Sequence, residues 1–144
     1  MNRALAILLL AVLAGCEPPP APQAPVAAMP SERRVLLTIN FDFNSHTIRP
    51  SSYLLLDNVA IALNDERLRG SHFDINGHTD IIGRLGYNIG LSYMRAGAVM
   101  DYLAARGVPI DSMHPQGFGP LQLLDPANPA SPANRRVEIV AISP

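Results

Sequence analysis

The chain has 144 residues, with 11 basic and 12 acidic side chains and a formal net charge of −1 at pH 7. This balance argues against a nucleic-acid-binding domain, which needs a basic surface, so we expect no nucleic-acid partner. The length allows one domain of about a hundred residues, which can fold without disulfides.

The first 15 residues have the pattern of a bacterial secretory signal. A short basic start, Met1 to Arg3, precedes an apolar run from Ala4 to Val12 that is too short for a membrane-spanning helix. Residues 13–16, Leu-Ala-Gly-Cys, resemble a lipobox, so we expect residues 1–15 to be removed and Cys16, the only cysteine, to be acylated. The alternative is an ordinary secretory signal followed by a chance cysteine.

The composition of residues 16–32 predicts a linker that begins at the acylated cysteine. Prolines recur from Pro18 to Pro30 and deny this segment helix or sheet hydrogen bonds. We expect an extended tether with a reach on the order of 45 Å; the alternative is a plain disordered terminus. Glu17 favours the outer membrane, by resemblance to enterobacterial sorting. Residues 33–144 then form the folded domain.

Hydrophobic periodicity predicts a strand and a helix in the first half of this domain. Alternating apolar residues favour a strand from Val35 to Phe41, and a polar loop follows from Asp42 to Arg49. Pro50 is typical of a helix start. The apolar side expected for this helix consists of Leu55, Leu56, Val59, Ala62 and Leu63.

A second strand, a loop and a second helix come next. The residues around Phe73 alternate between apolar and polar, as in a half-buried strand. Glycines within residues 81–87 indicate a loop. The spacing of apolar residues then predicts a helix from Ile89 to Arg106, with Asn88 as its N-cap and Gly107 just past its C-terminal end.

This strand–loop–helix unit contains two charges that suit a zwitterionic ligand. Asp80 follows the strand, and Arg95 lies in the second turn of the predicted helix. The unpaired amides at a helix N-terminus attract anions. Asp80 would bind an ammonium group, while Arg95 and the helix amides would bind a carboxylate. The alternative is an internal Asp80–Arg95 ion pair that only stabilises the loop.

The C-terminal part contains two more strands. We expect a helical turn at Val108–Ser112, strands at Met113–Phe118 and Arg136–Ile142, and a proline-containing loop at Gly119–Ala133. Strands that alternate with helices predict an α/β fold in the order βαβαββ, in which helices cover one face of a mixed sheet.

Several short motifs occur in a fixed order along the domain. They are Phe41-Asp42-Phe43-Asn44-Ser45, Gly77-His78-Thr79-Asp80, Leu91-Ser92, Arg95-Ala96, Gly117-Phe118-Gly119-Pro120 and Asn134-Arg135-Arg136-Val137-Glu138-Ile139. In this order they resemble the OmpA-like C-terminal domain, which also forms the peptidoglycan-associated lipoproteins. The resemblance covers about residues 33–142.

The resemblance implies non-covalent binding of peptidoglycan through the diaminopimelate of its stem peptide, without catalysis, cofactor or metal. The distal end of diaminopimelate is a free amino acid, which is the kind of ligand that the two charges predict. In the family, an aspartate and an arginine bind this end, and their positions fall on Asp80 and Arg95. Further contacts implied by the resemblance fall on Phe41, Asp42, Thr79, Asn88, Leu91, Arg135 and Arg136. The alternatives are a core role for Phe41 and a structural role for the arginine pair.

We therefore expect a lipoprotein of the outer membrane whose periplasmic domain tethers that membrane to the cell wall. One alternative is a wall-anchored interaction subunit of an envelope machine, such as a Tol–Pal, secretion or motor complex, with other envelope proteins as partners. Another is a wall-cleaving hydrolase, but Ser92 lacks an evident histidine base. A zinc site built on His72, His78 and Asp80 would need further converging ligands.

The lipobox interpretation predicts that Cys16→Ser blocks acylation and releases the protein from membranes. Multiple acyl chains hold a protein stably on a bilayer, whereas a hydroxyl at this position cannot take the thioether-linked chain. Fractionation of cells and the electrophoretic mobility of the processed chain measure this outcome. Unchanged processing, with the serine variant still in the membrane fraction, would contradict the interpretation.

Overall fold

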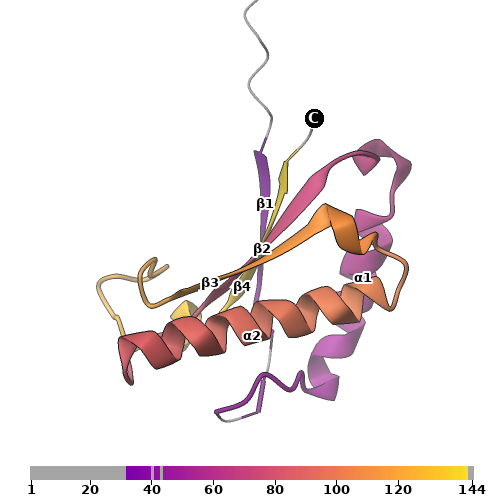
Figure 1. Cartoon of the computed structure of the whole chain (residues 1–144). Coiled ribbons are helices and arrows are strands. Elements are labelled where there is room, and N and C mark those ends of the chain that lie inside the picture. The colour runs from indigo at the N-terminus through magenta and orange to yellow at the C-terminus, as the bar shows by residue number, and fades with distance from the viewer. Residues whose placement is uncertain (1–31, 40, 43, 143–144) are drawn as a thin grey trace, which may run out of the picture.

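The computed structural model describes residues 32–39, 41–42 and 44–142, which form one mixed sheet and two main helices (Figure 1). The strands are β1 (Glu32–Leu37), β2 (His72–His78), β3 (Met113–Gly119) and β4 (Val137–Ile142), and the helices are α1 (Tyr53–Leu63) and α2 (Leu85–Ala104). The strand order is β1-β4-β2-β3. Strand β4 is antiparallel to both of its neighbours, whereas β2 and β3 are parallel. The predicted βαβαββ fold is confirmed.

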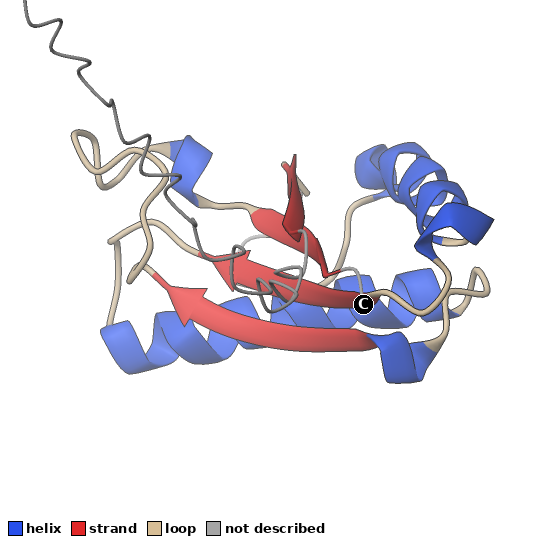
Figure 2. Cartoon of the chain, turned by 90° about the horizontal axis from the view of Figure 1, so that it is seen from above, coloured by secondary structure: helices blue, strands red, loops and turns tan. Residues whose placement is uncertain are grey.

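Helix α2 runs along one face of the sheet and packs on β2 and β3 (Figure 2). The core lies between them and includes Phe73 and Ile75 from β2, Val99 and Leu103 from α2, and Ile139 from β4. Each of these side chains is almost fully buried, and burying one contributes about 1.5–3 kcal/mol. Within the described residues, neither helix has both the length and the apolar character of a membrane-spanning segment.

The apolar side predicted for α1 is partly wrong. Leu56 and Ala60 are the buried residues of this helix, whereas Leu55 and Ala62 lie at the surface. The helix is apolar on nearly all sides, so its periodicity does not define one buried face. Its contacts with α2 and the sheet decide which side is buried.

Strand β1 is displaced from its predicted position by about three residues. It begins at Glu32 rather than Val35, because Glu32 to Leu37 all pair with β4. It ends before Phe41, which instead forms an isolated antiparallel bridge with Ile48. This bridge closes the loop that follows β1.

Helix α2 begins four residues before its predicted start, so the expected N-cap role of Asn88 is wrong. Gly83, with a φ of 106°, is sufficient to turn the chain. Gly86 therefore remains in the helix, where the burial of later residues outweighs its low propensity. Asn88 lies inside the first turns, and Arg84 precedes the helix without a side-chain cap. Gly107 does take the expected left-handed conformation beyond the helix end.

Two glycines let α2 approach the sheet closely. A Cβ atom on Gly77 would lie 2.1 Å from the carbonyl oxygen of Ser92, and one on Gly117 would lie 2.6 Å from the backbone nitrogen of Tyr93. Neither separation is possible for real atoms. The first half of α2 is therefore held directly over the ends of β2 and β3.

The strand directions bring distant segments together at one end of the sheet. Strands β1 and β2 both run antiparallel to β4, so their carboxyl ends lie beside the start of β4. Residues 41–42, 79–80 and 135–136 follow or precede these ends. Glu32 and Ile142, the first and last described residues, pair at the opposite end of the sheet (Figure 1).

The close approach predicts that Gly117→Ala destabilises the fold. The added methyl group meets backbone atoms of α2, which cannot move aside as a flexible side chain can. Such overpacking lowers the free energy of unfolding by about 1–3 kcal/mol. Urea denaturation of purified protein measures this change.

Gly97→Ala is the matched control, because no atom lies within 4 Å of the Cβ position at this helical glycine. Replacing a helix-interior glycine with alanine stabilises by roughly 0.5–1 kcal/mol. A Gly117→Ala variant as stable as the wild type would show that α2 is not held against the sheet in this way.

Candidate ligand-binding site

A cavity of about 580 Å³ lies at the end of the sheet where the three segments meet. It is enclosed by the loop after β1, the loop after β2, the first turns of α2 and the residue that precedes β4. Its lining residues are Phe41, Asp42, Asn44, Arg49, Thr79, Asp80, Ile82, Gly83, Tyr87, Asn88, Leu91, Arg95 and Arg135. The structure thus brings together every predicted contact residue of the domain except Arg136. Cys16 lies outside the described residues.

Asp80 is a buried carboxylate held in a fixed orientation. Its Oδ1 accepts a hydrogen bond of 3.0 Å from the backbone N–H of Ile82, and its Oδ2 accepts one of 2.8 Å from Arg135. Its ion pair is therefore with Arg135, and among the described residues none is formed with Arg95. Each carboxylate oxygen can accept a second hydrogen bond, so Asp80 retains capacity for a ligand donor.

Arg95 reaches the cavity from the third turn of α2, because this helix begins four residues earlier than predicted. Its Nε donates a 3.0 Å hydrogen bond to the carbonyl of Ser45, and its guanidinium lies 4.9 Å from the centre of the Phe41 ring. Burial, followed by the nearby charge of Arg135, lowers the pKa of Arg95. Among the described residues, nothing accepts from its two terminal nitrogens, which leaves a bidentate donor facing the cavity.

The charges around the cavity leave an excess of positive groups. Arg49 pairs with Asp42 at 2.9 Å, and Arg135 pairs with Asp80. Arg95 is the third arginine in the lining, and it has no carboxylate partner within the described chain. The cavity can therefore bind a carboxylate at Arg95 and an ammonium group at Asp80.

Residues on α2 and the loop after β1 complete the walls. Asn88 donates a 3.0 Å hydrogen bond to the carbonyl of Ile82, which fixes the loop after β2 to the helix. The Tyr87 hydroxyl bonds to the Asn44 side chain across the cavity mouth. Sequence reasoning missed Tyr87, Asn44 and Arg49 as lining residues. The Arg49–Asp42 charge pair within one short loop was the available signal.

Hydrogen bonds of the Asn134 side chain hold the long loop before β4 in place. This fully buried side chain accepts from the N–H of Asp125 and donates to the carbonyls of Asn128 and Pro129. Pro129 in turn accepts from the N–H of Ile81, beside Asp80. Asn134 therefore positions both the neighbouring Arg135 and the loop that carries Asp80.

Arg136 lies outside this cavity. It is buried, and its Nε donates a 2.8 Å hydrogen bond to Glu138 while its terminal nitrogens donate to the carbonyl of Gln122. Glu138 also meets Arg34 at 3.4 Å. The two arginines of the motif thus face different surroundings, and only Arg135 enters the main cavity.

His78 is buried directly behind the site. Its ring stacks on Phe118 with centroids 5.4 Å apart, and neither ring nitrogen has a hydrogen-bond partner among the described residues. Burial, followed by the charge of Arg136, lowers its pKa to about 4, although Glu138 acts in the opposite direction. His78 is therefore neutral at pH 7. In the part of the chain that the structure describes, no three His, Cys, Asp or Glu side chains converge to bind a metal.

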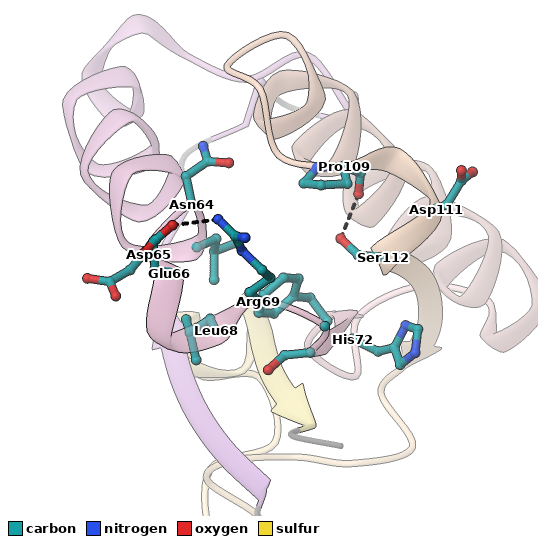
Figure 3. Close-up of a pocket in the computed structure, with 13 residues that line it drawn as sticks. Asn64, Asp65, Glu66, Leu68, Arg69, His72, Pro109, Asp111 and Ser112 are labelled. Carbon is teal, nitrogen blue, oxygen red and sulfur yellow. Dashed lines mark hydrogen bonds and ion pairs between the residues drawn. The ribbon is translucent and has the colours of Figure 1, made fainter.

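A second cavity, of about 430 Å³, lies at the opposite end of the sheet, where β2 begins (Figure 3). Charged side chains around this second cavity form ion pairs at the protein surface. Arg69 binds Glu66, and Arg67 binds Asp65 beside it. Ser112 donates to the carbonyl of Pro109. Unlike the first cavity, this one does not combine a buried carboxylate with an unpaired guanidinium.

Comparison with known proteins shows similarity over most of the described chain. A model of the OmpA family matches residues 40–138. Outer membrane protein A of Shigella flexneri is 34% identical over 102 residues, which are 71% of this chain and 28% of that protein. The similarity therefore spans less than a third of this curated relative.

Solved structures share the fold. The peptidoglycan-associated lipoprotein from Burkholderia pseudomallei superposes with a TM-score of 0.60 at 31% identity, over 72% of this chain and 87% of that one. The cell wall anchor of the T6SS from Pseudomonas aeruginosa superposes with a TM-score of 0.56 at 29% identity, over 72% of this chain and 75% of that one.

The buried His78 predicts that stability falls as pH is lowered. Its pKa is about 4 in the fold against an ordinary value of 6.5, so between these values the unfolded chain binds more protons. The stability is fully present above pH 6.5, and up to about 3 kcal/mol is lost as pH falls through this interval toward 4. Urea denaturation at a series of pH values measures the loss.

His78→Gln should flatten this dependence, whereas His72→Gln, at an exposed position on the same strand, should leave it unchanged. If the wild type and the His78→Gln variant lose stability equally between pH 6.5 and 4, another group causes the acid sensitivity.

Proposed function

Because the chain belongs to the OmpA family, we propose that its domain binds peptidoglycan non-covalently through the diaminopimelate of the stem peptide. One observation carries the proposal. A buried, oriented carboxylate at Asp80 and an unpaired bidentate donor at Arg95 line one cavity. The distal end of diaminopimelate carries an ammonium and a carboxylate on one carbon, which matches this pair.

The proposed binding mode assigns one ligand group to each charge. The ammonium donates to Asp80, and the carboxylate accepts two hydrogen bonds from the terminal nitrogens of Arg95. Both are charge-assisted interactions, which are roughly twice as strong as neutral hydrogen bonds. Arg135 keeps its bond to Oδ2, and the ammonium uses the remaining acceptor capacity of the Asp80 carboxylate.

Apolar side chains of the cavity suit the aliphatic part of the same ligand. Phe41 and Leu91 line the cavity beside the two charges. Ile81 and Ile82, on the loop after β2, are 54% and 66% exposed and extend the apolar surface outward. We propose that these isoleucines pack on the aliphatic stem of the ligand or on an envelope protein bound beside it.

The positions of the termini support a role as a tether. The Pro-rich segment joins the domain at Glu32, at the opposite end of the sheet from the cavity. A membrane anchor at Cys16 and a wall peptide in the cavity would therefore pull on opposite ends. We propose that the protein is a lipoprotein anchored in the outer membrane, with this domain in the periplasm.

Two other functions make different demands on the site. A wall-anchored subunit of an envelope machine would use the same cavity and an additional protein partner; the similarity to the T6SS wall anchor favours keeping this candidate. A hydrolase would need an accessible nucleophile. Ser92 is fully buried, and its hydroxyl donates to Ile89 and accepts from Gly119.

The binding mode predicts that Asp80→Ala and Arg95→Ala each abolish sedimentation with sacculi that contain diaminopimelate. Each variant leaves one charge of the ligand unpaired, which costs about 2–5 kcal/mol and weakens binding by more than about tenfold. Asp101→Ala and Arg69→Ala are the matched controls, because both side chains are exposed and lie outside the cavity. Thermal melting of every variant shows whether it is folded.

Walls with lysine in place of diaminopimelate extend this test, because lysine lacks the distal carboxylate. The wild type should bind such walls poorly, and Arg95→Ala should lose less affinity on them than on diaminopimelate walls. Wild-type affinity in a folded Asp80→Ala variant would overturn the assignment. Release of soluble fragments from the same sacculi would support the hydrolase instead.

A further inference from the structure

A third cavity, of about 280 Å³, adjoins the first on the far side of Arg95 and Arg135. Phe41, Arg49, Arg95 and Arg135 line both cavities and form the wall between them. Arg136 and His78 line only this third cavity. Four arginines thus surround a small space next to the proposed ligand site. We call it the basic cavity.

The acidic partners of these arginines lie outside the basic cavity. Arg49 pairs with Asp42, Arg135 with Asp80, and Arg136 with Glu138. Among the described residues that line the basic cavity, none is acidic. Among the residues that the structure describes, Arg95 has only the Ser45 carbonyl as its acceptor. The arginines therefore present positive charge to a space without a negative group.

His78 adds an unsatisfied donor to the same space. Its side chain has no solvent exposure, and its Nε2 lies 3.7 Å from Glu138, which is too far for a hydrogen bond. A neutral imidazole carries one N–H, and a buried donor without a partner destabilises the fold. Both ring nitrogens are screened from solvent, so an anion in the basic cavity would act on His78 through its charge and not by direct contact.

We propose that the basic cavity is an anion subsite for a second carboxylate of the same wall peptide, the free carboxylate that ends a stem at diaminopimelate. This inference rests on the proposed function, because it requires the distal end of diaminopimelate to occupy Asp80 and Arg95. The other end of the residue carries a carboxylate that is either free or joined by an amide bond to the next residue. Only the free form is an anion. The protein therefore prefers stems whose carboxyl end is not extended.

The shared wall makes simultaneous binding possible. Arg135 uses one nitrogen, Nη1, to bind Asp80 at 2.8 Å. A guanidinium has five N–H donors, so Arg135 can hold Asp80 and still donate to a carboxylate in the basic cavity. Arg49 is about half exposed and bonds to Asp42 through Nε, which leaves its terminal nitrogens for the same anion.

The test uses two synthetic tripeptides, L-Ala-γ-D-Glu-meso-diaminopimelate with all carboxylates free, and its derivative amidated only at the carboxylate of the peptide-linked centre. Titration calorimetry with the full chain measures both affinities. We expect the amide to bind about tenfold more weakly, because it loses charge-assisted hydrogen bonds. Arg49→Gln should reduce this ratio, because it removes one of the charged donors that line the basic cavity. Arg69→Gln, which also breaks an exposed arginine–carboxylate pair, should preserve it.

The imidazole of His78 provides a second, independent readout. It is surrounded by the charges of Arg136, Glu138 and Arg34. A carboxylate bound beside it favours the protonated form, so the free tripeptide should raise the pKa of His78 above its value of about 4, and the amide should not. The titration of its ring resonances by NMR measures this shift in folded protein.

The outcomes separate this inference from the function on which it rests. Equal affinities for the acid and the amide, both lost in Asp80→Ala, would overturn the anion subsite and leave wall binding intact. Binding of neither tripeptide to the wild type would overturn both. A weaker amide, with the ratio reduced by Arg49→Gln and the pKa of His78 raised only by the acid, establishes the subsite.

Discussion

The close packing of α2 on the sheet requires that Gly77 and Gly117 have no side chains. Both glycines let the backbone of α2 touch the ends of β2 and β3. This contact determines the height of the helix above the sheet, and therefore where Asn88 and Arg95 reach. A helix displaced outward by one methyl group would separate Arg95 from Asp80, which comes from the sheet. The geometry of the site is thus a consequence of backbone packing.

Charged side chains near the site form ion pairs both at the cavity and buried behind it. Asp80 and Arg135 pair at the cavity, while Arg136 and Glu138 pair in the sheet behind it. Removing one member of a buried ion pair leaves the other charge uncompensated. The pair with Glu138 therefore keeps Arg136 in its buried position, away from the main cavity. His78 lies between these two pairs and stays neutral because burial lowers its pKa. The positive excess is consequently kept at the cavities, where an anionic ligand can reach it.

Local sequence patterns were sufficient for much of the architecture. The alternation around Phe73 and the helical spacing after Leu91 predicted β2 and α2, and Gly107 marked the end of that helix. Element boundaries were less predictable. Asn88 is a good N-cap by propensity, but its amide instead fixes the Ile82 carbonyl, and the helix begins at Leu85. A cap preference of about 1 kcal/mol is easily outweighed by tertiary contacts.

Local sequence was enough to predict the chemistry of the domain: Asp80 follows a strand and Arg95 lies on the next helix, an acid and a base suited to a zwitterion. Only the tertiary structure decided how these charges are paired. Arg135 is 55 positions from Asp80 in the chain, yet it holds the carboxylate that spacing alone had left open to Arg95. It also separated Arg135 from Arg136, adjacent residues that point into different surroundings. Both arginines precede β4 and do not lie in it, so strand alternation could not assign them to different surroundings. Contacts between segments that are far apart in the chain depend on strand order and direction, which no local pattern encodes.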